Sequence, residues 1–148
     1  MAEPAAARAR TAAEAAEARG YGLTAEDLRD WASFSPVEIY WAVKHGLTPG
    51  VAGHWARAGL RIGDTVRAIA LGMTPAQLRP WTEAGFAPFD AVEASEMRIS
   101  LATAAAWREA GFILPDAALL IGDGWTLAEA VAARYAGIAQ EDWSAARL

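Results

Sequence analysis

The stretches TPGVAGHWARAGL (residues 48–60), TPAQLRPWTEAGF (residues 74–86) and SLATAAAWREAGF (residues 100–112) decide the fold. Each has Thr or Ser at position 1, Trp at position 8, Ala at position 11, Gly at position 12 and an apolar residue at position 13. The rest of the chain from residue 11 divides into units of the same length, except for a shorter second unit and a truncated last one: 11–23, 24–34, 35–47, 61–73, 87–99, 113–125, 126–138 and 139–148. Internal periodicity of this kind indicates a helical-repeat protein.

Each junction between units carries the signals of a helix end followed at once by a helix start. Gly at position 12 favours the left-handed conformation that ends a helix, and the apolar residue after it supplies the hydrophobic contact of a Schellman ending. The following Thr or Ser is a favoured N-cap, often with Pro at the first helical position. We therefore predict one helix of about nine or ten residues in each unit. The glycines at position 12 are Gly46, Gly59, Gly72, Gly85, Gly111 and Gly137.

The residue at position 8 alternates in size between neighbouring units. Positions 5, 8 and 11 share one side of a helix and are mostly apolar, so we interpret the tryptophans at position 8 as core residues. A large residue on one helix would pack against a small one on the next, so the full repeat is a pair of helices, or about 26 residues. The large set is Trp31, Trp55, Trp81 and Trp107, and the small set is Ala42, Ala68, Ala94 and Leu120.

These patterns predict an all-α fold, a short α-solenoid or helical-repeat array of ~13-residue single-helix units paired into ~26-residue repeats. Residues 1–23, rich in Ala, Glu and Arg, are expected to form a capping helix, and residues 24–148 the helical-repeat domain, within a single domain overall. Pro80 lies inside its unit and should kink or shorten that helix. Pro115 and the Gly122–Gly124 segment leave the helix bounds in residues 113–125 open.

Composition excludes several classes of function. The chain has 148 residues, no Cys and a formal net charge of -5. The missing thiols exclude disulfides and Cys-based zinc sites, and the negative charge repels nucleic-acid phosphate and anionic membranes at long range. No apolar run approaches the roughly 20 residues of a membrane span, and phosphate-loop, hydrolase and metalloprotease motifs are missing. We expect a cytoplasmic, non-enzymatic protein without metal or cofactor, in which His45 and His54 are surface residues on successive helices.

Trp41 departs from the pattern, since it stands at position 7 rather than position 8. Tyr40 lies beside it, and Lys44 and His45 follow three and four residues later on the same helical face. This group is typical of an interface hot spot, or of an aromatic at the end of a stack that packs against the N-terminal helix. Variable outward positions 3, 6, 7 and 10 supply the partner-binding candidates Tyr40, Trp41, Lys44, His54, Arg57, Arg79 and Glu83, and His45, at position 11 beside Trp41, is a further candidate.

Residues 45–60 (HGLTPGVAGHWARAGL) and 71–86 (LGMTPAQLRPWTEAGF) resemble the helix-turn-helix of MerR-type transcription regulators. The resemblance implies a recognition helix that would present Thr48, Pro49, Gly50, Val51 and His54 to DNA. Because the motif recurs every 26 residues, as a stacking unit would, our leading prediction is non-catalytic protein–protein binding, with another protein as partner. DNA binding is the alternative, and a ligand-binding or enzymatic bundle would require a deep pocket with converging polar groups.

Overall fold

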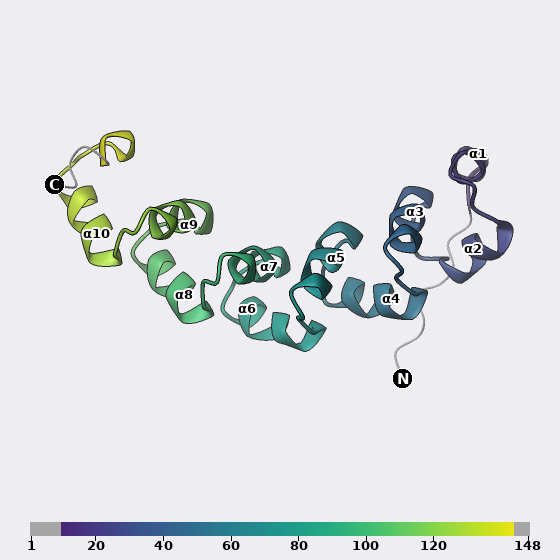
Figure 1. Ribbon diagram of the computed structural model, residues 1–148, viewed down its shortest axis with the longest axis horizontal. Coiled ribbons are helices and arrows are strands. Elements are labelled where there is room, and N and C mark those ends of the chain that lie inside the picture. Colours follow the sequence, from purple (N-terminus) through teal and green to yellow (C-terminus); the bar gives the residue numbers. More distant parts are fainter. Residues whose placement is uncertain (1–9, 144–148) are drawn as a thin grey trace. The chain divides into compact units, whose positions relative to one another are not determined.

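The computed structural model describes residues 10–143, whose regular secondary structure consists of ten α-helices and two short 3-10 helices without a strand (Figure 1). The prediction of an all-α fold is thereby confirmed. Residues 1–9 of the predicted N-terminal helix lie outside the described residues. The helices are α1 Ala12–Gly20, α2 Ala25–Asp30, α3 Pro36–Lys44, α4 Pro49–Arg57, α5 Ile62–Ala70, η1 Pro75–Leu78, α6 Arg79–Glu83, α7 Pro88–Glu96, α8 Leu101–Glu109, α9 Leu114–Gly122, α10 Leu127–Tyr135 and η2 Gln140–Asp142.

The helices from α3 onward begin at even intervals along the chain. Their first residues are 36, 49, 62, 75, 88, 101, 114 and 127, which are thirteen residues apart, with η1 in the fourth place. Every α-helix in this series except α6 has nine residues. The predicted helix length is therefore confirmed in these seven units, but it is wrong for α2, which has six residues, and for residues 74–86, which are divided between η1 and α6.

Six helices end as the glycine pattern predicts. The six glycines expected at position 12 all have positive φ, between 71° and 97°. In each case the N–H of position 13 donates to the carbonyl of position 8, as from Leu47 to Ala42 (2.9 Å) and from Phe112 to Trp107 (3.0 Å). This is the six-to-one hydrogen bond of the Schellman motif. Gly22, Arg98 (φ 59°) and Gly124 occupy the same place in their units, although the sequence pattern did not identify them.

Helix starts are held by side chains that accept backbone hydrogen bonds. Thr48 Oγ1, for example, accepts from the Val51 N–H at 3.2 Å, which satisfies one of the free donors of the first turn. Ala87 has no hydroxyl group, and there the Asp90 carboxylate accepts from the Ala87 N–H at 2.9 Å. The hydroxyl caps are Thr11, Thr24, Ser35, Thr48, Ser100 and Thr126.

Pro80 interrupts the one helix that departs from the series. The segment Pro75–Leu78 is a 3-10 helix, and a five-residue α-helix, Arg79–Glu83, follows it. Proline has no N–H to donate to the carbonyl four residues earlier, and its ring crowds that carbonyl. The Arg79 N–H instead bonds three residues back, to the Ala76 carbonyl. The prediction that Pro80 disturbs its helix is confirmed.

The chain divides into two compact units, Met1–Arg79 and Pro80–Leu148. The prediction of one repeat domain from residue 24 onward is not tested by this division and stays a prediction. In the first unit, Trp31 packs edge-to-face on Phe34, with ring centroids 5.5 Å apart. The Arg10 guanidinium donates to the Trp31 carbonyl at 2.8 Å and also to the Phe34 carbonyl. Around this pair lies a cluster of buried side chains that comprises Trp31, Phe34, Ile39, Ala42, Ala52 and Ile62.

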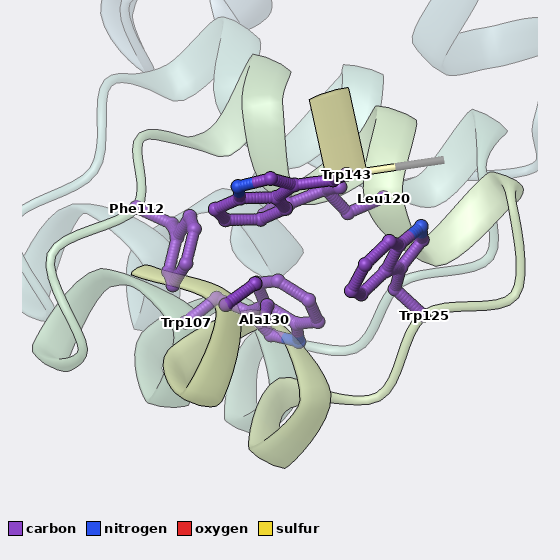
Figure 2. Close-up of a cluster of buried hydrophobic side chains, with 8 residues drawn as sticks. Trp107, Phe112, Leu120, Trp125, Ala130 and Trp143 are labelled. Carbon is purple, nitrogen blue, oxygen red and sulfur yellow. The ribbon is translucent and has the colours of Figure 1, made fainter. Parts of the chain in front are cut away.

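The second unit has an aromatic core in which Phe112 and Trp125 flank the indoles of Trp107 and Trp143 (Figure 2). The Trp107 and Phe112 centroids are 5.2 Å apart, and those of Trp125 and Trp143 are 5.4 Å apart. The Trp143 indole N–H donates to the Ile138 carbonyl at 2.8 Å, which satisfies its one polar atom. The predicted burial of position 8 is confirmed in both sets, since none of the eight residues is more than 7% exposed.

Two arginines of the second unit make the same contacts 26 residues apart. The Arg108 guanidinium lies 4.0 Å from the centre of the Phe86 ring and donates to the Ala84 carbonyl. The Arg134 guanidinium lies 3.8 Å from the Phe112 ring and donates to the Ala110 carbonyl at 3.3 Å. Each arginine therefore holds the Schellman end of the helix two places earlier, through a cation–π contact and a carbonyl that the helix leaves free.

Candidate functional site

The candidate site lies on α3, whose sequence separates a buried face from an exposed one. Pro36, Ile39 and Ala42 are buried, at spacings of three residues. A helix turns about 100° per residue, so Trp41 lies on the side opposite Ile39. Its side chain is 44% exposed, an unusual position for an indole, since the four tryptophans at position 8 are buried. Ser35 and Glu38 form a capping box that fixes the start of this helix.

Aromatic and cationic side chains surround Trp41. The Lys44 ammonium lies 4.8 Å from the Trp41 ring centre and 5.8 Å from that of Tyr40. The His45 ring is nearly parallel to the Trp41 indole, with centroids 6.1 Å apart. Tyr40, rather than Trp41, stacks on Tyr21 at the end of α1, at 4.9 Å. The tyrosines thus anchor the cluster to the N-terminal helix, while the indole stays accessible to solvent.

A pocket of about 600 Å³ opens beside the indole, between α3 and α5. Apolar atoms of Val37, Trp41, Ile62 and Val66 form most of its lining. Its polar groups come from the start of α3, from His45 at the end of α3 and from Arg61 at the start of α5. The full set of lining residues is Ser35, Val37, Glu38, Trp41, His45, Arg61, Ile62, Gly63 and Val66. An apolar pocket with a few polar groups at its edge is the usual form of a binding site on a protein surface.

No protein-family model, curated protein or solved structure matches the chain. The candidate site is therefore defined by the geometry of the pocket alone.

The charge at the pocket differs in sign from that of the whole chain. The exposed Arg61 side chain forms no ion pair with any residue that the structure describes. The Glu38 carboxylate accepts from the Ser35 N–H at 3.1 Å and from the Ser35 hydroxyl at 2.8 Å, so it serves the helix cap. With Lys44 close to the indole, cations outnumber the one lining carboxylate, on a chain whose formal net charge is -5.

The other predicted partner-binding residues lie apart from this pocket. His54 and Arg57 are exposed on α4, and Arg79 and Glu83 are exposed on α6. None of these four residues lines the pocket. Of the residues that the MerR resemblance assigns to DNA, Thr48 uses its hydroxyl to cap α4. The role of His54, Arg57, Arg79 and Glu83 in binding a partner stays a prediction.

The described residues include no group of three or more His, Asp or Glu side chains placed to hold a metal ion. Within residues 10–143, no helix has both the length and the apolar character that a membrane crossing needs.

Sequence reasoning found one wall of the site and missed the other. Tyr40, Trp41, Lys44 and His45 were candidates because the indole breaks the repeat pattern. The α5 wall, formed by Arg61, Ile62, Gly63 and Val66, was not identified. One signal was available, since Gly63 is a glycine inside a predicted helix without a capping role.

Proposed function

We propose that this chain is a non-catalytic protein–protein interaction scaffold, built from tandem short helices that form a short α-solenoid. Nine-residue helices are marginal on their own in water and need neighbours against which to bury an apolar face. The even helix starts, and the arginine contacts that recur 26 residues apart in the second unit, support stacking of successive helix pairs. Such an array presents a continuous surface to a partner. A cytoplasmic location is part of this proposal.

The single observation that carries the proposal is the exposure of Trp41 at the mouth of the α3–α5 pocket. Tryptophan is enriched among residues that contribute most to binding energy, because it buries a large rigid surface at low entropic cost. Contact of the exposed indole and the apolar pocket with water is unfavourable for the free protein. A partner that buries both surfaces removes this unfavourable hydration, which favours binding.

The proposal is tested by affinity capture from a lysate of the source organism, with the whole chain as bait. The comparison is between the unaltered protein and a triple variant, Tyr40→Ala, Trp41→Ala and Lys44→Ala. Tyr135→Ala is the matched control, because this aromatic side chain is 91% exposed and lies on α10 in the other unit. We expect at least one protein to be retained by the unaltered chain and by the control but lost by the triple variant.

Equal retention of every captured protein by the triple variant would remove this surface as the binding site. Binding to duplex DNA with a steep dependence on salt would instead favour the MerR-like alternative, because phosphate contacts release counterions. Both outcomes contradict the proposal, and circular dichroism of the triple variant shows whether its helices remain intact.

A further inference from the structure

The groups around the α3–α5 pocket distinguish between classes of partner. The Lys44 ammonium already lies over the Trp41 ring, 4.8 Å from its centre. That position is the one a cationic ligand would use on an indole, by cation–π attraction. A cationic partner segment would therefore have to displace Lys44 or lie beside it, whereas an anionic segment gains an attractive contact with it.

Arg61 adds a second cation on the opposite wall. It is the N-cap residue of α5, and its guanidinium has only N–H donors, so it cannot accept a hydrogen bond from the first turn of that helix as a capping side chain does. Guanidinium groups bind carboxylates through two parallel hydrogen bonds, which adds orientation as well as attraction. The one acidic lining residue, Glu38, is held in its capping box with Ser35.

Gly63 keeps the α5 wall open. It occupies the second position of α5, where a Cβ atom would meet no heavy atom within 4 Å. The fold therefore has room for a side chain at this position. Glycine weakens a helix by about 1 kcal/mol relative to alanine. A side chain at this position would occupy part of the pocket, because Gly63 lines it together with Trp41 and Val66.

We infer that this pocket binds an acidic segment of a partner protein, with one apolar side chain inserted beside Trp41 and Val66 and an adjacent Asp or Glu paired with Arg61. The inference rests on the proposed function, and it adds the chemistry of the partner segment to it. The apolar side chain supplies burial, and the carboxylate supplies orientation and selection against basic segments.

The test is selection of a displayed library of random linear peptides against the full-length chain at low ionic strength. We expect the enriched peptides to share an apolar residue next to Asp or Glu. Synthetic copies should bind at least tenfold more weakly to Arg61→Glu, and a new selection against that variant should enrich Lys or Arg in place of the acid. Added salt should weaken binding to the unaltered chain, since the charge pair is accessible to solvent.

Gly63→Gln blocks the pocket without changing Trp41 or Arg61, and it should reduce the affinity of the peptides at least tenfold. Gly50→Gln is its matched control, because Gly50 is also the second residue of its helix, α4, and a Cβ there also meets no atom within 4 Å. The control should bind as the unaltered chain does.

Three results would overturn the inference: no enrichment above the bare support, enrichment of basic peptides, or acidic peptides that bind Gly63→Gln as well as the unaltered chain. The proposed function survives each of them if the triple variant of Tyr40, Trp41 and Lys44 still loses a captured protein. If that variant loses none, the proposed function itself fails.

Discussion

Arg98 offers the sharpest test of how the helices of this chain end. It has φ 59°, whereas the corresponding residue of every other complete thirteen-residue unit is a glycine with positive φ. A side chain in the left-handed region costs roughly 1–2 kcal/mol. Glycine, in turn, loses about 0.5–1 kcal/mol more backbone entropy on folding than other residues do. We therefore expect Arg98→Gly to raise the free energy of unfolding by about 0.5–1 kcal/mol.

Gly72→Ala is the matched reverse change. Gly72 has φ +74°, and a Cβ placed on it meets no heavy atom within 4 Å, so the substitution isolates the backbone cost from any steric clash. By the same two terms as for Arg98, we expect the free energy of unfolding to fall by about 0.5–1 kcal/mol. The two changes should thus have opposite signs and similar size.

Urea unfolding followed by far-UV circular dichroism measures both changes, with thermal melting as a second observable. For a chain of this size, 1 kcal/mol shifts the melting temperature by about 2–4 °C. The account of left-handed residues at the helix ends would be refuted if Arg98→Gly unfolded more easily than the unaltered chain. It would also be refuted if Gly72→Ala were as stable as the unaltered chain.

Further stability changes follow from burial and contacts. Trp107 is 3% exposed, so Trp107→Ala should lower the free energy of unfolding in urea by about 3–5 kcal/mol. Trp41 is 44% exposed, so Trp41→Ala should lower it by less than about 1 kcal/mol. The buried Thr65 hydroxyl has no hydrogen-bond partner among residues 10–143. Thr65→Val should therefore raise the urea midpoint by an amount equivalent to about 1 kcal/mol, and Thr65→Ser, which keeps the hydroxyl, should not. A methyl group on Gly111 would lie 2.9 Å from Arg134 Nη1, so part of the loss in Gly111→Ala should be regained in the double variant with Arg134→Met, which a double-mutant cycle quantifies.

The helix bounds could be predicted because the signals that set them are local. A Thr or Ser hydroxyl reaches a backbone N–H three residues later, and a left-handed residue bonds back within its own helix end. Pro80 acts equally locally, through its own missing N–H. Each of these interactions spans at most one or two turns, so the residues that make it can be read along the chain.

Arg98 and Gly124 show where this local reasoning fails. Arg98 takes the left-handed conformation because the helices on either side fix the junction there, and nothing in its own residue type indicates that conformation. At Gly124 the signal was present, but Pro115 and the neighbouring Gly122 obscured the register. Pro115 proves to lie in the first turn of α9, where proline is tolerated.

The candidate site was predictable only in part, because it joins residues that are distant in sequence. Trp41 could be found, since it departs from the burial pattern of its own helix. The pairing of Trp41 with Val66 across the pocket depends on how α3 and α5 pack, which no local signal specifies. The same holds for Arg134 and Phe112, which meet only when the second unit folds.

The central claim is that helices of nine residues recur every thirteen residues and are each closed by a left-handed residue. Backbone NMR assignment, with Cα chemical shifts and N–H to Hα couplings, measures this directly along the chain. We predict helical shifts over each run of nine residues that begins at Pro36, Pro49, Ile62, Pro88, Leu101, Leu114 and Leu127. We also predict positive φ at the twelfth position of every complete thirteen-residue unit, Arg98 included. Helical shifts that continue through Gly72 or Gly111, or extended shifts within the predicted helices, would contradict the account.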